Sequence, residues 1–255
     1  MRERCFAFGR SRSRSSQPVD RLGSSLGLVC DIAEMEEGCR KVREKPVRVI
    51  AAACKGGGIG KNGTLPWNLP CEFQYFLRSV TQVSKPGKFN MLVWGKLCWY
   101  SNPQTMFPMA NVLHAVLSKT MQSVPDHAHF LCQDLESAVL LAAKYPLADL
   151  IETIWVVGGS RVYKDALEHP WCDLVFLTAI MAEFECDVFF PEMDAQVFKK
   201  QERFAGVPSG IQEENGMKYE FQVFKKECKH GGNEENVLSD TESQHHQTPS
   251  RWTSR

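Results

Sequence analysis

The sequence lacks three features that would assign it to a special class of protein. Its Lys+Arg and Asp+Glu counts are both 30, so the formal net charge is zero and gives no support for a nucleic-acid or anionic-membrane partner. No apolar run approaches the roughly 18 residues that span a bilayer, and no internal repeat is visible. A chain of 255 residues with 43% hydrophobic and 24% charged residues is expected to be an ordinary soluble protein with one sizeable core.

The ten cysteines include no C-x-x-C pair, the spacing typical of zinc ribbons and redox motifs. Several lie in apolar runs, among them Cys54 after Ile50–Ala53 and Cys132 after Phe130–Leu131. Cysteines in such positions pack as small hydrophobic residues. We therefore expect reduced thiols and a reducing compartment.

The N-terminal part of the chain differs in composition from the middle. Residues 1–19 contain five arginines, four serines and one acid, a composition typical of an organelle transit peptide. The alternatives are a disordered tail or translation from a later start such as Met35. Residues 31–46 are interpreted as a linker, so residues 1–46 are expected to form a disordered extension. The expected location is cytoplasmic, or mitochondrial if the Arg/Ser-rich segment is a transit peptide.

The C-terminal part, residues 228–255, is almost wholly polar and has too little apolar content to build a core. A disordered tail is predicted there. The histidine pair at 245–246 is interpreted as part of this tail, so no metal site is predicted. One folded domain is expected over residues 47–227.

Within this domain, strand-like apolar runs alternate with segments of helical periodicity. Asp134 is a plausible N-cap for one of these helices. The predicted strands are 47–54, 89–94, 112–117, 128–132, 153–157, 173–180 and 219–224, and the predicted helices 71–83, 135–145 and 162–167. Strands separated by helices predict an α/β fold, a mostly parallel sheet with helices on both faces.

A glycine-rich segment follows the first predicted strand. Residues 58–63 match the G-x-G-x-x-G pattern of a dinucleotide-binding turn. That turn requires a helix directly behind it, but Pro66 and Pro70 exclude a regular helix. Lys61 is followed by Asn62 rather than Ser or Thr, so a phosphate-binding P-loop is also excluded. The segment is therefore predicted to be a loop that runs to Trp67.

A single acid, Glu72, stands near the start of the predicted helix 71–83. Phe73 and Phe76 lie close to it on the same helix. A carboxylate flanked by aromatic rings could bind an amidine-like pair of N–H groups on a flat heterocycle through two charge-assisted hydrogen bonds. The alternative is a first-turn glutamate that faces solvent and stabilises the helix dipole.

Three strand ends carry residues suited to phosphate. Gly158-Gly159-Ser160 connects a buried strand to a helix, whose first N–H groups would bind an anion. Gly95-Lys96 and Ser118-Lys119 follow two other strands, at the carboxyl edge where open α/β sheets bind ligands. A simple tight turn and solvated lysines are the alternatives.

Taken in order, these motifs resemble those of the dihydrofolate reductase family. They are Gly-Ile-Gly-Lys-Asn-Gly-x-Leu-Pro-Trp at 58–67, the acid-bearing helix, Gly-Lys at 95–96, Leu-Ser-Lys at 117–119, Val-Gly-Gly-x-x-Val-Tyr at 157–163 and the segment 184–191. The resemblance covers residues 47–227. It implies a three-layer α/β fold with a central, mostly parallel eight-stranded sheet, helices on both faces and a C-terminal antiparallel strand.

For the substrate, the resemblance implies three kinds of contact. Glu72 matches the family's catalytic acid, and Trp67 and Thr178 match residues that act with it. Phe73 and Phe76 match the residues that sandwich the pterin and aminobenzoyl rings. The other implied substrate contacts are Ile50, Ala52, Val157 and Tyr163.

For the cofactor, the resemblance implies NADPH rather than NADH, because Lys96 and Lys119 would favour a 2′-phosphate. Residues 59–67 resemble the mobile loop that closes over nicotinamide. The implied cofactor contacts are Ala52, Ile59, Gly60, Gly63, Leu65, Lys96, Cys98, Ser118, Lys119, Gly158, Gly159, Ser160 and Val162.

The implied chemistry is hydride transfer from nicotinamide C4 to pterin C6, with protonation at N5. Glu72 would be nearly the only ionisable group in an apolar pocket, so desolvation is expected to raise its pKa. It would orient the pterin and help to deliver the proton, through a water.

Several positions depart from the family's pattern. Val112 replaces the arginine that binds the carboxylate of the folate glutamate tail, a loss of about 1.5–3 kcal/mol, or roughly 10- to 150-fold in affinity. His114 is expected to face away from Val112 and so not to compensate. Cys98 replaces a threonine that contacts the cofactor diphosphate. The usual acid at Thr64 and the usual threonine at Val188 are also absent.

Three functional hypotheses remain open. The first is an NADPH-dependent dihydrofolate reductase that feeds one-carbon metabolism, with weakened recognition of the folate tail. The second is a reductase for a pterin without a glutamate tail. The third is a family member that binds NADPH, pterin or RNA in a regulatory role without useful turnover, although the neutral charge does not support RNA binding. We expect a small-molecule substrate, no membrane partner and a monomer.

Overall fold

The computed structural model describes residues 43–227. The predicted transit peptide, most of the predicted linker and the predicted polar tail lie outside this range. Among the described residues, no helix is both long and apolar enough to cross a membrane.

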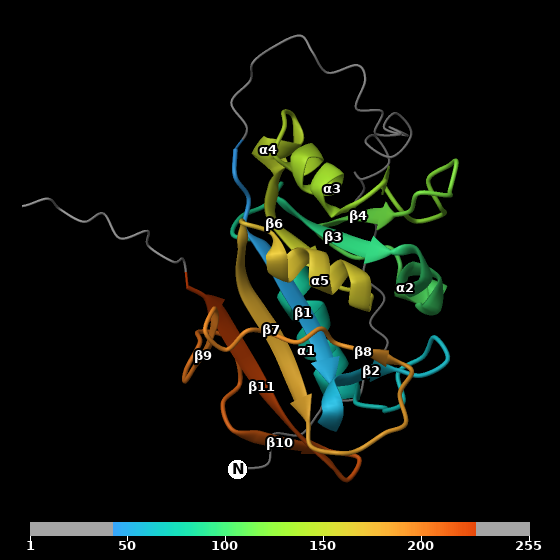
Figure 1. The fold of residues 1–255 in the computed structure, drawn as a ribbon. Coiled ribbons are helices and arrows are strands. Elements are labelled where there is room, and N and C mark those ends of the chain that lie inside the picture. The colour runs from blue at the N-terminus through green and yellow to red at the C-terminus, as the bar shows by residue number, and fades with distance from the viewer. Residues whose placement is uncertain (1–42, 228–255) are drawn as a thin grey trace, which may run out of the picture.

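A twisted nine-stranded sheet forms the centre of the fold, with strand order β10-β11-β7-β1-β6-β3-β4-β5 and β9 paired with β11 (Figure 1). The six strands from β7 to β5 are parallel, whereas β9, β10 and β11 are antiparallel to their neighbours. Their bounds are β1 Val47–Ala53, β3 Phe89–Gly95, β4 Val112–Leu117, β5 Phe130–Cys132, β6 Ile151–Val156, β7 Cys172–Ile180, β9 Phe198–Gln201, β10 Ile211–Glu214 and β11 Met217–Lys226.

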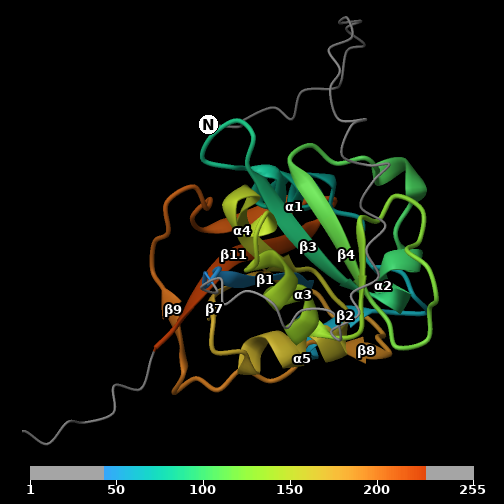
Figure 2. The ribbon, with the colours of Figure 1, turned by 90° about the horizontal axis from the view of Figure 1, so that it is seen from above.

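Two helices cover one face of the sheet and three cover the other (Figure 2). On the first face lie α1, Pro70–Thr81, and α2, Lys96–Ser101; on the second lie α3, Leu135–Ala142, α4, Leu147–Leu150, and α5, Ser160–Glu168. The core on the α1 side is rich in aromatic residues, among them Trp94, Trp99 and Trp155. The core on the α5 side consists mostly of aliphatic residues such as Val49, Val93 and Ile154. The predicted three-layer α/β fold is thus confirmed.

Capping explains where α3 begins. The side chain of Asp134 accepts a hydrogen bond of 2.9 Å from Ser137 N, and Ser137 Oγ accepts one of 3.2 Å from Asp134 N. This reciprocal pair satisfies two N–H groups that the first helical turn leaves without partners. The predicted N-cap at Asp134 is therefore confirmed.

The glycine-rich segment is a loop, as predicted, and α1 begins only at Pro70. Part of it pairs in a way that the sequence did not predict: β2, Gly58–Gly60, and β8, Val188–Phe189, form a separate two-stranded sheet. A short 3₁₀ turn, Lys55–Gly57, connects β1 to β2. This small sheet lies at the carboxyl end of β1, next to the candidate site described below.

The described part of the chain begins with a segment that contacts the domain. Lys45 is buried, and its Nζ donates hydrogen bonds to Ala148 O at 2.6 Å and Ile151 O at 2.8 Å. These bonds satisfy a charge that would otherwise be costly to bury. Arg43 also contacts the domain, through a bond of 2.9 Å from its guanidinium to Asp149, so contacts begin before the boundary expected at Val47.

Candidate active site

The central side chain of the candidate site is Glu72, in the first turn of α1. It is only 8% exposed. Thr178 Oγ1, on β7, donates a hydrogen bond of 2.8 Å to Glu72 Oε1. The sequence could not exclude a solvent-facing first-turn glutamate, but the burial of Glu72 does. The fold therefore holds a carboxylate at a fixed position between α1 and the sheet.

Burial raises the pKa of Glu72 above its ordinary value. The hydrogen bond from Thr178 lowers the pKa of Glu72, and the negative charge of Glu214 raises it. Glu214, on β10, accepts the N–H of Cys71 in the first turn of α1 at 2.9 and 3.0 Å. Sequence reasoning missed Glu214, although the hairpin signal Asn215-Gly216 directly after it could have placed it at a turn. The net effect of these groups keeps a proton on Glu72 at higher pH than on an ordinary glutamate.

The ends of β1 and β6 lie beside this acid. Ile50 and Val157 are buried, and Ala52 is half-buried. The hydroxyl of Tyr163, on α5, donates a hydrogen bond of 3.0 Å to Ile50 O. Burial raises the pKa of Tyr163 well above its ordinary value, so this hydroxyl stays neutral. Tyr163 thus holds α5 against the strand that carries Ile50 and Ala52.

Phe73 and Phe76, predicted to sandwich the rings of the substrate, stack on each other. Their ring centroids are 5.8 Å apart and their planes differ by 21°. A third ring between two parallel rings would need a separation of about 7 Å. The two phenylalanines therefore form one aromatic surface on α1, and a ring cannot enter between them unless one moves.

The glycine-rich loop brings Trp67 to the same region. Trp67 is 8% exposed, packs against Phe184 with centroids 5.7 Å apart, and belongs to a small apolar cluster that Ala52 also contacts. Its Nε1 is buried and has no hydrogen-bond partner among the described residues. Gly60 is buried and Ile59 half-buried.

The tip of this loop lies apart from the acid. Gly63 and Leu65 are exposed, and Gly63 lies close to Ser101 on α2. The structure thus brings Trp67, Ala52 and Glu72 to one region and leaves Leu65 exposed at the surface.

Three glycines meet where β3 and β6 end. Gly95 N donates a hydrogen bond of 2.6 Å to Gly158 O, and a cis peptide bond joins Gly158 to Gly159. Gly158 has φ of 127°, a conformation that side chains disfavour, and a Cβ there would lie 3.0 Å from Cys98 Sγ. A Cβ on Gly159 would meet nothing within 4 Å. Because Gly159 caps α5 without any side-chain hydrogen bond, the first N–H groups of α5 are available to an anion.

The side chains around these glycines have partners of their own. Ser160 Oγ donates a hydrogen bond of 2.5 Å to Phe189 O on β8, and buried Val162 packs against Gly95. Cys98 Sγ lies 3.8 Å from Val157 O, and burial raises the pKa of Cys98 to about 11, so it stays a neutral thiol.

The loops after β3 and β4 are adjacent because these strands are parallel neighbours. Lys96 Nζ donates a hydrogen bond of 3.3 Å to Thr120 Oγ1, and Ser118 Oγ accepts the N–H groups of Thr120 and Met121 at 3.2 Å. Lys119 is exposed and attracted to the Asp134 carboxylate, whose pKa it helps to lower. Lys96 follows Gly95 and so lies near the start of α5, whereas Lys119 lies near Asp134 at the start of α3.

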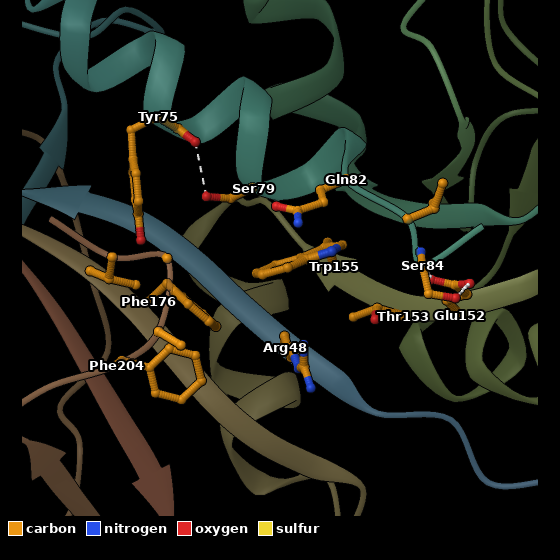
Figure 3. A pocket seen from close by; sticks show the side chains of 14 residues that line it. Arg48, Tyr75, Ser79, Gln82, Ser84, Glu152, Thr153, Trp155, Phe176 and Phe204 are labelled. Atoms are coloured by element: carbon orange, nitrogen blue, oxygen red, sulfur yellow. Dashed lines mark hydrogen bonds between the residues drawn. The ribbon is translucent and has the colours of Figure 1, made fainter. Parts of the chain in front are cut away.

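A separate cavity of about 320 Å³ lies under α1, toward the amino ends of the strands (Figure 3). Its lining includes Arg48, Tyr75, Ser79, Trp155 and Phe204. None of the predicted site residues lines it, and Arg48 is paired with Asp173 at 3.2 Å. The cavity is therefore distinct from the candidate site.

The sequence profile of the family described as "Dihydrofolate reductase" matches residues 46–226. The chain belongs to the dihydrofolate reductase family. This is a family of NADP-dependent oxidoreductases.

Individual relatives support this family assignment. The dihydrofolate reductase of Sus scrofa is 42% identical over 183 residues, which cover 71% of this chain and 98% of that protein. The dihydrofolate reductase of Rattus norvegicus is 43% identical over the same length. Among solved structures, Schistosoma mansoni dihydrofolate reductase has 27% identity and a TM-score of 0.64, covering 72% of this chain and 100% of that one.

One region differs from what the family resemblance implies. Val112 is 4% exposed and packs in the aromatic-rich core on the α1 side, where Met106 and Met109 adjoin it and Phe107 is also buried. The expectation that His114 faces away from Val112 is wrong, because residues two apart in a strand share a face.

His114 nevertheless cannot supply the missing charge. It accepts a hydrogen bond of 3.1 Å from Trp94 Nε1, and burial, together with His129 and His127, lowers the pKa of His114 to about 3. Its other ring nitrogen is buried without a partner among the described residues. His114 is therefore a neutral core residue and cannot replace the arginine that the family resemblance implies at position 112.

Proposed function

We propose that this chain catalyses the NADPH-dependent reduction of 7,8-dihydrofolate, or of a closely related dihydropterin, to the tetrahydro form. The observation that carries the proposal is Glu72, a buried carboxylate held by Thr178 and placed beside the ends of β1 and β6. A flat heterocycle with an amidine-like edge is the ligand such a group is suited to bind, through two charge-assisted hydrogen bonds.

The chain's own residues hold and move one proton. Burial favours the neutral form of Glu72, so the acid keeps its proton at higher pH than an exposed glutamate does. Thr178 fixes the orientation of the carboxyl group, since its hydroxyl donates to Oε1, whose second lone pair stays available to the substrate beside Oε2. Proton delivery to N5 of the pterin would then pass through a water.

The glycine cradle fits NADPH. The N–H groups at the start of α5 carry no side-chain cap, and open space faces Gly159, so a diphosphate can approach the backbone closely. Lys96 and Lys119 are exposed on the adjacent rim and would hold the adenosine phosphates, including a 2′-phosphate. When bound, the cofactor supplies the hydride. The thiol of Cys98 adds little, because it is a weak hydrogen-bond donor.

A specific observation favours a substrate without a charged tail. Val112, which belongs to the apolar core that Met106 and Met109 also contact, makes the position that would receive the glutamate tail apolar, and His114 is neutral. A carboxylate brought there would lose hydration without gaining a cationic partner. We therefore propose that the chain reduces dihydropterins whether or not they carry a glutamate tail, with little preference for the tail.

The test is NADPH oxidation by the purified full chain, followed by absorbance, with dihydrofolate and with a dihydropterin that lacks the tail. The expected result is steady oxidation with both substrates that Glu72→Ala abolishes while NADPH binding persists. NADPH binding without reduction of either substrate would contradict the catalytic proposal and leave a nucleotide-binding member of the family.

A further inference from the structure

Two cysteines meet at the base of the glycine-rich loop. Cys54 directly follows β1, and Cys186 lies in the segment between β7 and β8, yet their Sγ atoms are 3.8 Å apart. Both are free thiols. Cys54 is buried, whereas Cys186 is half-buried and within reach of small reagents in solvent. Neither has a part in the proposed reduction.

The backbone holds the two sulfurs together. Lys55 N donates to Ala182 O at 3.1 Å, Asp187 N to Gly60 O at 3.0 Å and Phe190 N to Gly57 O at 2.8 Å. These three bonds tie the segment 54–60 to the segment 182–190 on both sides of the thiol pair. The approach of Cys54 to Cys186 is thus set by the chain around them.

Gly58 makes room for the pair. A Cβ on this residue would lie 2.4 Å from Cys186 Sγ and 3.0 Å from Cys54 Sγ. Real Cβ atoms do not come so close, so both thiols pack directly against a backbone that has no side chain at this point. No side chain at position 58 separates the two sulfur atoms.

We propose that Cys54 and Cys186 are a redox modification site that forms a reversible disulfide when the chain meets a small disulfide such as oxidised glutathione. The Cys186 thiolate attacks one sulfur of oxidised glutathione and releases one glutathione thiolate. The Cys54 thiolate then attacks the sulfur of Cys186 and releases the second. Two protein thiols are oxidised to one disulfide, one glutathione disulfide is reduced to two thiols, and the two protons pass to the two leaving thiolates.

The geometry requires only a small movement. The sulfurs must approach from 3.8 Å to a bond length of about 2.05 Å. Burial raises the pKa of the Cys186 thiol, so little thiolate is present near neutral pH and oxidation over hours is expected.

The bond would fasten the glycine-rich loop at its base. In the reduced chain, Lys55–Glu183 and Lys61–Glu185 pair at 3.7 Å across the same two segments, and both pairs are exposed and therefore weak. A covalent link would add to the three backbone hydrogen bonds between these segments and would not break when the loop opens. If the proposed function holds, turnover should fall several-fold on oxidation, because loops over active sites must open for ligand exchange.

Peptide mapping tests the bond itself. The full chain is incubated with oxidised or with reduced glutathione, the remaining thiols are alkylated, and proteolytic peptides are weighed. The expected product is a cross-linked peptide that contains Cys54 and Cys186, lighter by two hydrogen atoms than its parts and lost on reduction. It should be absent from Cys186→Ser and retained in Cys71→Ser, a control that removes another half-buried thiol.

If Cys186→Ser does not fold, as judged by circular dichroism, Cys54→Ser provides the same test. Recovery of both cysteines as alkylated or glutathione-bound peptides after oxidation would overturn the proposal. Peptide mapping does not depend on turnover, so it tests the disulfide even if the chain has no reductase activity. A fully formed bond with unchanged NADPH oxidation would overturn the effect on the loop.

Discussion

The substitution Val112→Arg tests the account of substrate choice. A guanidinium at this position could bind the carboxylate of the folate tail as a bidentate pair. A hydrogen bond to a charged group contributes about 1.5–3 kcal/mol, which corresponds to roughly 10- to 150-fold in affinity. We therefore expect the KM for dihydrofolate to fall by that factor, with kcat nearly unchanged and no gain for a tail-less dihydropterin.

The structure also predicts a cost. Val112 is 4% exposed among apolar side chains, so the new charge lacks a partner until substrate binds. The free energy of unfolding of the ligand-free variant should fall by about 1–3 kcal/mol. Dihydrofolate should restore much of this loss, because a ligand stabilises the folded state that binds it.

The assay is steady-state NADPH oxidation with the two substrates, beside thermal unfolding with and without dihydrofolate. Val112→Leu, which keeps the site apolar, is the matched control and should leave the KM for dihydrofolate high. A folded Val112→Arg chain whose KM for dihydrofolate equals that of the parent would refute the assignment of Val112 to the tail site.

Three further predictions concern the acid. Thr178→Val removes the hydrogen bond to Glu72 Oε1, so kcat/KM should drop about tenfold or more. Because that bond lowers the pKa of Glu72, the pH–rate profile should also shift to higher pH, and an unshifted profile would contradict this. Glu214→Gln removes a negative charge that raises the pKa of Glu72, so the profile should shift to lower pH, while unfolding free energy changes by less than about 1 kcal/mol because the amide oxygen still accepts Cys71 N. Glu72→Gln should stabilise the fold most at high pH. A carboxyl whose pKa is raised on folding favours the folded state below its unfolded pKa of about 4.3 and loses that contribution as pH rises through the folded pKa. Equal urea midpoints for parent and variant at all pH values would therefore be inconsistent with the burial of Glu72.

The alternation of elements could be predicted from the sequence because it depends on local periodicity. The strand 112–117 is observed with the predicted bounds, and the helix predicted at 71–83 is observed at Pro70–Thr81. Asp134 was recognisable because N-capping acts within four residues. The strands β2, β8 and β9 were missed because each is short and pairs with a strand that is not adjacent to it in the chain. The strand β10 was missed although its partner β11 follows directly after the turn at Asn215-Gly216.

The residues of the candidate site also divide into those that the sequence could predict and those that it could not. Glu72 and the glycine cradle stand in motifs whose order is visible in the sequence. Glu214 and the Cys54–Cys186 pair reach their partners across more than a hundred residues, so no spacing could indicate them. The position of His114 could have been inferred from strand periodicity, but its neutrality depends on burial and on two other histidines, which only the packed structure reveals.

The most direct test of the central claim is a single-turnover measurement of NADPH oxidation by the full chain with dihydropterin, as a function of pH, for the parent and for Glu72→Gln. The account predicts that the parent's rate falls as pH rises through the raised pKa of Glu72, and that the variant is slow at every pH because it has no proton to deliver. A variant that matches the parent across the pH range would contradict the claim that Glu72 is the acid of this site.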